Sequence, residues 1–360
     1  MNRKAFPSLP LSERGRIVNF EIDSLFLRGN TWGDPSSRSV HVYLPKGYEQ
    51  EDKDYPLVVF LPAYGSTGQG LLSWKLGQQS MTQRLDRLIA EGAPPCIAIF
   101  PDCLSSLVGT QFIDSAAVGR YGSYLMKDVL SQVRSRFRCT SQTGLIGHSS
   151  GGYGALRLAI DFPQEVCAVV CHAGDMGFAT GYCGDLALSI GPIRKAGSPM
   201  AYIREYWGKS HHSHQEWAAM NILCMSCVYA PVDELVAHRR DEINKGTDPL
   251  DPNLPFPSIL PVNYETGEID FQRFLSWEKH DPIVLIDQKY AQEALKGVKW
   301  LFLDAGAWDE YHLQLGAQRF CRKLTQYGIP HIYEEFPGGH RGTSYRFDRS
   351  LPELLQKLSI

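Results

Sequence analysis

The feature that most constrains the fold is an apolar run, a glycine-rich turn and a helical pattern in immediate succession, Leu145-Ile146-Gly147-His148-Ser149-Ser150-Gly151-Gly152-Tyr153-Gly154. Residues 143–146 are predicted to form a buried strand, and residues 155–160 a helix. The helix is expected to end before Pro163, because the residue preceding a proline avoids helical geometry. Residues 166–171 are again apolar and predict a second buried strand, so this stretch indicates a parallel sheet with helices packed on it.

The turn contains the pattern G-x-S-x-G, with Ser149 at its centre. On its own, the pentapeptide is equally typical of an ordinary Gly/Ser turn. A serine at the tip of a sharp strand-to-helix turn, however, needs neighbours without side chains, and Gly147 and Gly151 meet that need. The start of the following helix favours developing negative charge. With its flanking strand and helix, the pattern predicts a nucleophilic serine.

The rest of the chain supplies six further predicted strands, at residues 17–27, 39–44, 57–61, 97–100, 298–303 and 332–336. Helices are predicted at residues 81–91, 124–137 and 311–327, and at 352–358 behind the capping-box pattern of Ser350-Leu351-Pro352-Glu353. The last six strands alternate with helices. This order predicts an α/β fold with an eight-stranded, mostly parallel, doubly wound sheet whose first strands are antiparallel at one edge.

The alternation breaks after Gly174, and roughly 120 residues pass before the next strand, too many for a bare loop. We expect a core formed by residues 1–175 and 298–360, with an insertion, or cap, at 176–297 after the sixth strand. The insertion is rich in aromatic residues. Most are expected in its own core, and a minority could line a substrate pocket; they are Tyr202, Tyr206, Trp207, Trp217, Tyr229, Phe271, Phe274 and Trp277.

Composition narrows the range of partners. The net charge of −3 argues against binding to nucleic acid or anionic membranes, and no apolar run is long enough to span a membrane. Residues 6–10 lack the apolar core of a signal peptide. The nine cysteines are an odd number, and several lie in apolar runs, which suits reduced thiols. We expect a cytoplasmic protein, or a secreted one if a leader preceded Met1, with a small-molecule ligand. The oligomeric state stays open, a homodimer included.

Two short patterns could bind metal, but neither is well supported. Cys224 and Cys227 have metal or redox spacing without a second pair. The histidines at 211, 212 and 214 lack an accompanying Asp, Glu or Cys cluster, so the composition favours a polar loop. No metal and no cofactor are predicted.

A serine nucleophile needs a histidine base and an acid that orients it. In a sheet of this kind the chain order is serine, acid, histidine, with the last two on loops after later strands. His340 follows the last predicted strand and is the preferred base, with His148 and His172 as rivals. The acid is left among Asp304, Asp309 and Glu310, which follow the seventh strand. Asp309 is preferred because it lies deeper in the loop than Asp304, which could be a turn cap.

An oxyanion hole needs two backbone donors. The first would be the N–H of Ser150, directly after the nucleophile. The second should come from the loop after the strand at 57–61. Pro62 has no N–H, so Ala63 or Tyr64 must supply it, and Tyr64 is preferred.

Four blocks of this chain resemble the putative esterase (esterase D-like) family of the α/β-hydrolase superfamily. They are Tyr55 to Leu61, Gly147 to Leu156, Gly306-Ala307-Trp308-Asp309-Glu310 and Phe336-Pro337-Gly338-Gly339-His340. The resemblance covers about residues 38–175 and 298–345. It implies the triad roles for Ser149, Asp309 and His340 and the oxyanion roles for Tyr64 and Ser150. The chain departs from the family in having Pro62-Ala63 where His-Gly is usual, and in its long insertion.

Members of that family hydrolyse carboxylic esters and thioesters, including feruloyl, siderophore and S-formylglutathione esters, and some transfer acyl groups. The resemblance thus implies a serine esterase that works through an acyl-enzyme. An acyltransferase with the same triad is the alternative. A non-catalytic binding module on the same scaffold is the third hypothesis, because a fold alone does not fix function.

Overall fold

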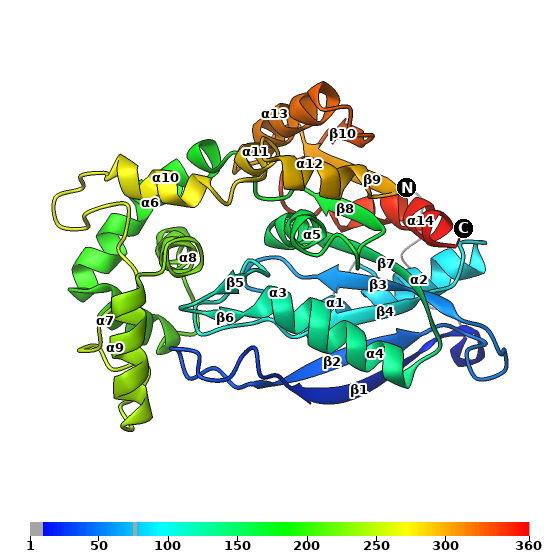
Figure 1. Ribbon diagram of the computed structural model, residues 1–360, viewed down its shortest axis with the longest axis horizontal. Coiled ribbons are helices and arrows are strands. Elements are labelled where there is room, and N and C mark those ends of the chain that lie inside the picture. Colours follow the sequence, from blue (N-terminus) through cyan, green and yellow to red (C-terminus); the bar gives the residue numbers. More distant parts are fainter. Residues whose placement is uncertain (1–9, 75–77, 360) are drawn as a thin grey trace.

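The computed structural model describes residues 10–74 and 78–359, and its centre is an eight-stranded sheet (Figure 1). The strand order is β1-β2-β4-β3-β7-β8-β9-β10. Only β2 runs against its neighbours β1 and β4, and all later pairings are parallel. The strands are β1 (Arg16–Asp23), β2 (Ser37–Leu44), β3 (Tyr55–Leu61), β4 (Ile97–Pro101), β7 (Cys139–His148), β8 (Ala168–His172), β9 (Trp300–Gly306) and β10 (Ile332–Phe336). A separate short hairpin joins β5 (Asp114–Ser115) to β6 (Gly119–Arg120).

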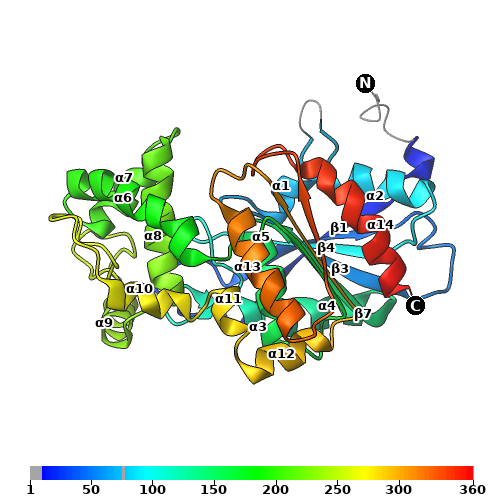
Figure 2. The ribbon, with the colours of Figure 1, turned by 90° about the horizontal axis from the view of Figure 1, so that it is seen from above.

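The central strands are apolar on both faces because helices cover both faces (Figure 2). Side chains of β3 alternate, with Val58 and Phe60 on one face and Leu57 and Val59 on the other. The first face packs against α2 (Met81–Ala90) and α14 (Phe347–Leu358). The second packs against α4 (Leu130–Arg136), α5 (Ser150–Asp161), α12 (Lys289–Lys296) and α13 (Leu313–Gln326). The fold is the mostly parallel, doubly wound sheet that the sequence predicted.

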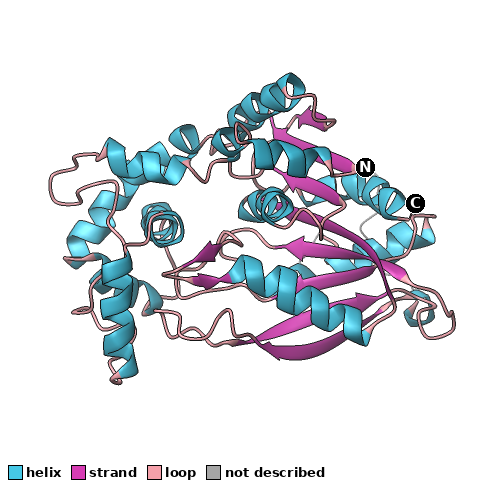
Figure 3. Ribbon diagram, viewed as in Figure 1, coloured by secondary structure: helices cyan, strands magenta, loops and turns pink. Residues whose placement is uncertain are grey.

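The segment between β8 and β9 contains only helices and loops in Figure 3, and most of it stands beside the sheet as a separate lobe. Its helices are α6 (Phe178–Ala196), α7 (Pro199–Trp207), α8 (His214–Tyr229), α9 (Asp233–Asn244), α10 (Phe271–Glu278), α11 (Pro282–Leu285) and α12. We propose that residues 176–297 are an insertion whose lobe comprises α6 to α10. The last two helices, α11 and α12, pack on α5 of the core.

One buried carboxylate joins the two ends of this lobe. Asp281, just before α11, accepts hydrogen bonds from the backbone N–H of Gly177 at 3.1 Å and of Phe178 at 2.7 Å, at the start of α6. It also caps α11 through the N–H of Ile283 at 2.9 Å. Helix N-termini carry free N–H groups, so one acceptor satisfies both helices. The chain therefore leaves and rejoins the core at nearly the same place.

Two element predictions need correction. Helix α14 begins at Phe347, five residues before the predicted start, and Pro352 lies inside it. The Ser350 hydroxyl does not cap a helix, because it pairs with His172. The predicted helix at 124–137 begins earlier, with α3 (Tyr121–Ser123), and its next six residues, Tyr124–Val129, have π-helical geometry. Short α1 (Gly68–Leu72) follows the loop after β3.

Within the described residues, no helix has the length and apolar character needed to cross a membrane. The N-terminal residues 6–10, used above for the localisation prediction, lie almost entirely outside the described part of the chain.

Candidate active site

Ser149 occupies the sharp turn between β7 and α5. Its backbone has φ 58° and ψ −126°, a conformation that a residue with a side chain rarely adopts. Its N–H donates to the His172 carbonyl at 2.9 Å, which ties the turn to β8. A Cβ atom on Gly147 would come within 2.3 Å of the Gly151 backbone, and one on Gly151 within 2.1 Å of the Leu61 carbonyl. The two glycines are thus required by close backbone contacts, as the pattern predicted.

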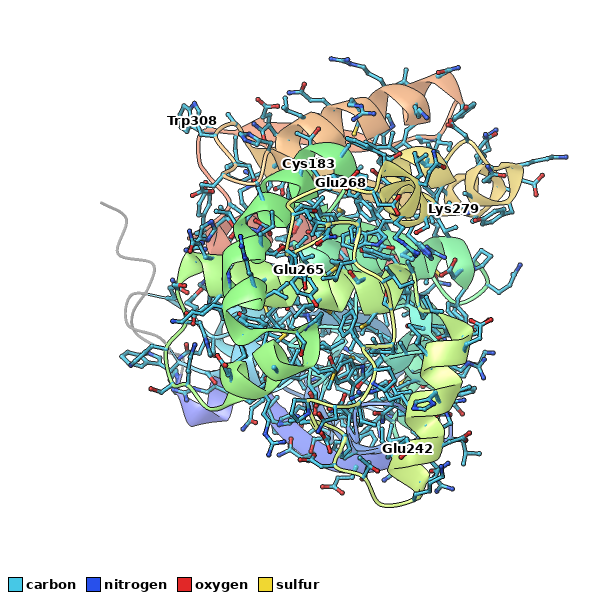
Figure 4. All side chains as sticks on the ribbon, turned by 90° about the vertical axis from the view of Figure 1, so that its left-hand side faces the viewer. Cys183, Glu242, Glu265, Glu268, Lys279 and Trp308 are labelled. Atoms are coloured by element: carbon cyan, nitrogen blue, oxygen red, sulfur yellow. The ribbon has the colours of Figure 1, made fainter. Side chains whose placement is uncertain are left out.

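His340 and Asp309 converge on this serine from the loops after β10 and β9. The His340 Nε2 lies 3.0 Å from the Ser149 Oγ, and its Nδ1 lies 2.8 Å from the Asp309 Oδ2. Asp309 is buried although its neighbour Trp308 is 69% exposed and projects at the edge of the molecule (Figure 4). Glu310 accepts a hydrogen bond from the His340 backbone N–H at 2.5 Å and holds the loop. The structure therefore brings the three preferred residues into contact.

The rival residues form a second, inaccessible arrangement. His172 Nδ1 lies 2.7 Å from Asp304 Oδ1, and its Nε2 lies 2.8 Å from the Ser350 hydroxyl. The other oxygen of Asp304 accepts from Arg346 at 2.7 Å. His172, Asp304 and Ser350 are all at most 2% exposed. No substrate could reach this serine in the folded protein, so the arrangement links β8, β9 and α14 and is structural.

His148 lies against His340, and within the described residues it makes no hydrogen bond to Ser149. Its ring centroid is 4.6 Å from that of His340, and its Nε2 is 3.1 Å from the His340 carbonyl oxygen. Burial, together with repulsion from the neighbouring His340 and His172, lowers the pKa of His148 to about 3. The ring is therefore uncharged near neutral pH and donates to the carbonyl of His340, which it helps to position.

The backbone N–H groups predicted to form the oxyanion hole lie at the start of α5 and in the loop after β3. Ser150 is the first residue of α5, so its N–H precedes the helical hydrogen bonds. In the loop after β3, Gly65 donates to the Val108 carbonyl at 3.2 Å and Ser66 to the Ala63 carbonyl at 3.0 Å. Among the described residues, the Tyr64 N–H makes no backbone hydrogen bond. The Tyr64 phenol donates to the Leu107 carbonyl at 2.9 Å, which fixes this loop.

Sequence reasoning missed Asp175, which lies in the loop after β8. Its Oδ1 is 3.4 Å from the Ser149 Oγ, and its Oδ2 accepts from Ser150 Oγ at 3.2 Å. Gln111 Nε2 and the Tyr182 hydroxyl donate to the same Oδ2 at 2.9 Å and 3.1 Å. Its position in the sequence could have indicated it. Ligands bind at the carboxyl ends of parallel strands, and Asp175 follows the predicted strand at 166–171.

A cavity of about 840 Å³ opens over Ser149. Helices of the lobe supply part of its wall, so the insertion contributes directly to the site. Trp217 lines the cavity, as was expected of a minority of the lobe aromatics, whereas Tyr202, Phe274 and Trp277 are buried within the lobe. The contributing lobe side chains include Phe178, Tyr182, Asp185, Trp217 and Asn221. Among the described residues, no three His, Cys, Asp or Glu side chains are grouped to hold a metal ion.

Comparisons with known proteins agree with this architecture. No curated protein matches the chain. A ferulic acid esterase is 17% identical with a TM-score of 0.55, over 96% of this chain and 99% of that one. S-formylglutathione hydrolase FrmB from Staphylococcus aureus is 15% identical with a TM-score of 0.53, over 96% and 99%. The enterobactin esterase FES from Shigella flexneri is 15% identical with a TM-score of 0.52, over 99% of this chain and 62% of that one.

At these identities the solved structures show the fold alone, and they confirm the predicted α/β-hydrolase fold. Sequence likeness to a family is a separate finding. The sequence model of the putative esterase family matches residues 35–358. Because the match spans most of the chain, the protein belongs to the putative esterase family and is an ester hydrolase.

Proposed function

We propose that the protein hydrolyses carboxylic esters or thioesters through an acyl-enzyme formed on Ser149. The observation that carries the proposal is the continuous hydrogen-bonded series from Ser149 Oγ through both nitrogens of His340 to Asp309. A serine hydroxyl is a poor nucleophile until a base removes its proton, and an imidazole at 3.0 Å can do so.

In the first half-reaction, His340 Nε2 takes the Ser149 proton as Oγ bonds to the substrate carbonyl carbon. Asp309 fixes the tautomer and stabilises the imidazolium that forms. The N–H groups of Ser150 and Tyr64 face the developing oxyanion. The alcohol or thiol leaves with the proton from His340. Water then attacks the acyl-enzyme, with His340 again as base, and the carboxylic acid is released.

The test is a fluorophosphonate probe combined with ester hydrolysis. We expect phosphonylation of Ser149, located by peptide mass spectrometry, and no label on Ser350, since that hydroxyl is buried. Ser149→Ala should lose about 10⁵-fold or more in kcat on p-nitrophenyl acetate. Hydrolysis at the wild-type rate by folded Ser149→Ala would refute the proposal. An unreactive Ser149 would instead support the binding-module hypothesis.

Acyl transfer by the same residues differs only in the second nucleophile. Adding alcohol or sugar acceptors to the assay and analysing the products separates the two reactions. Free carboxylic acid as the main product supports hydrolysis, and a new ester in its place supports transfer.

A further inference from the structure

Asp175 presents a buried carboxylate to the space directly beside the nucleophile. It is 8% exposed and lines the cavity, with Oδ1 at 3.4 Å from Ser149 Oγ. The three donors Gln111, Ser150 and Tyr182 all converge on Oδ2. Donors gathered on one oxygen favour the ionised group and leave the other oxygen directed at the nucleophile.

This carboxylate has no cationic partner within the described parts of the chain. No Lys, Arg or His nitrogen of those residues lies within 4.0 Å of it. Burial raises the pKa of Asp175, and the hydrogen bonds from Gln111, Tyr182 and Ser150 oppose that rise only in part. A buried charge that lacks a counter-ion is costly, so a cation arriving in the cavity would be stabilised here.

The part of the wall formed by the lobe also carries acidic and aromatic side chains, although Arg84 and Arg341 of the core line the cavity as well. Phe178, Tyr182 and Asp185 lie on one face of α6 and line the cavity. Asp185 is also 8% exposed, and it accepts a hydrogen bond from the neutral amide of Asn221 at 3.1 Å. Trp217 of α8 adds an aromatic surface. Carboxylates combined with aromatic rings suit an organic ammonium group.

The sheet order defines which part of a substrate meets Asp175. Strands β3 and β8 lie on opposite sides of β7, which carries Ser149. The oxyanion loop follows β3 and Asp175 follows β8, so the two flank the nucleophile from opposite sides. Asp175 therefore faces a substituent of the acyl group and not the carbonyl oxygen. With Oδ1 only 3.4 Å from Oγ, that substituent must be close to the carbonyl carbon.

We infer that Asp175 is a specificity-determining residue that selects acyl groups with a primary ammonium on the α or β carbon. The inference rests on the proposed function. A bound ammonium would neutralise a negative charge that otherwise opposes the oxyanion forming on the far side of Ser149. The preference should therefore increase kcat, and with it kcat/KM, and not merely lower KM.

The experiment compares three benzyl esters of nearly equal shape, with alanine, lactic acid and isobutyric acid as the acyl part. They carry an ammonium, a hydroxyl and a methyl group at the same position. Released benzyl alcohol is measured at pH 6.5, where an α-amino group is mainly protonated. We expect kcat/KM for the alanine ester to exceed that for the isobutyrate about 10- to 100-fold, with the lactate close to the isobutyrate.

Asp175→Asn keeps the shape and removes the charge, and should lower this ratio about 10-fold or more, while the fluorophosphonate still labels Ser149. Asp287→Asn is the matched control, an exposed aspartate held by Lys323 and Tyr327 outside the cavity, and should keep the wild-type ratio. If Asp175→Asn does not fold, the wild-type ratio alone decides, since equal hydrolysis of alanine and isobutyrate esters overturns the inference.

The remaining outcomes are also decisive. Lactate hydrolysed as well as alanine would show selection by hydrogen bonding, and would overturn selection by charge. Three inert esters with Ser149 still labelled by the fluorophosphonate would overturn this inference alone. Three inert esters with Ser149 unlabelled would overturn the proposed function as well.

Discussion

Two aspartates of this chain each hold the Nδ1 of a histidine, and accessibility separates their roles. Asp309 acts on His340, which borders the cavity, whereas Asp304 acts on His172, which is enclosed by β8, β9 and α14. The local hydrogen-bond geometry of the two pairs is nearly the same, at 2.8 Å and 2.7 Å. A distance alone would therefore not identify the catalytic pair.

Matched substitutions test this difference. Asp309→Asn should reduce kcat on a p-nitrophenyl ester about 10⁴-fold, because the amide no longer stabilises the correct imidazole form. Asp304→Asn should leave the chemistry largely intact in the folded fraction. It should lower the free energy of unfolding by about 3 kcal/mol, since it breaks a buried ion pair with Arg346. Urea unfolding and kcat, measured on both variants, check the assignment. Loss of kcat in Asp304→Asn with Asp309→Asn active would reverse it.

The elbow motif, the chain order and the depth of Asp309 in its loop were enough to select Ser149, Asp309 and His340 as candidates, and the structure places them in contact. Their catalytic roles remain predictions. Chain order could not show that Asp304 and His172, the alternative acid and base, hydrogen-bond to each other. That contact depends on the parallel pairing of β8 with β9. It also did not find Asp175, which no motif marks and which is defined only by what surrounds it.

At the scale of elements, Gly316 in α13 allows this helix to pack closely against the loop that carries Asp175. A Cβ atom on Gly316 would come within 2.0 Å of the Met176 carbonyl oxygen. Met176 directly follows Asp175, so the packing of α13 positions the backbone beside the nucleophile. Helix propensity favours alanine over glycine by about 1 kcal/mol, but a clash with the main chain is the larger effect.

Two Gly→Ala substitutions in helix interiors should consequently change the free energy of unfolding in opposite directions. Gly316→Ala should lower the free energy of unfolding by about 1–3 kcal/mol and reduce kcat/KM. Gly184→Ala in α6, where nothing lies within 4 Å of the added methyl group, should raise the free energy of unfolding by about 0.5–1 kcal/mol. Thermal or urea unfolding of the two variants gives the comparison. A stabilised Gly316→Ala would contradict this account of the contact.

Sequence patterns located all eight strands of the sheet. The buried strands β3, β4, β8 and β9 are nearly continuous apolar runs, whereas β1 and β2 alternate between apolar and polar residues. They misplaced the start of α14, because Pro352 resembles a first-turn proline although five helical residues precede it. The π-helical turn at Tyr124–Val129 has no sequence signature either. It lies next to tertiary contacts that the pattern of apolar spacing does not encode.

At the scale of the molecule, two partly buried histidines, His148 and His280, make stability depend on pH. Burial, with the charge of Arg157, lowers the pKa of His280 to about 4, and the pKa of His148 is lowered to about 3. Arg157 donates to the His280 Nδ1 across 3.2 Å, which requires the uncharged ring. Below pH 6.5 the unfolded chain binds protons that the folded protein excludes. Stability should therefore fall as the pH is lowered from 6.5 towards 4.

His280→Gln tests this linkage, since a glutamine oxygen can accept from Arg157 without titrating. The loss in free energy of unfolding between pH 7 and pH 5 should be about 1–2 kcal/mol smaller than in the wild type. Urea unfolding at the two pH values, with unchanged m-values, measures it. An identical pH dependence in both proteins would show that His280 is not protonated differently in the two states.

The hydrogen bonds that Asp281 accepts at the starts of α6 and α11 have a consequence for how this protein can diversify. Because both ends of the helical lobe are fastened to one carboxylate, residues of the lobe can be lengthened, trimmed or exchanged with little displacement of β8 or β9. The residues on the core that make and break bonds, and the lobe side chains that line the substrate cavity, are therefore structurally separate parts joined through Asp281. Natural variation in such a chain can then change what is accepted while the reaction itself is inherited intact.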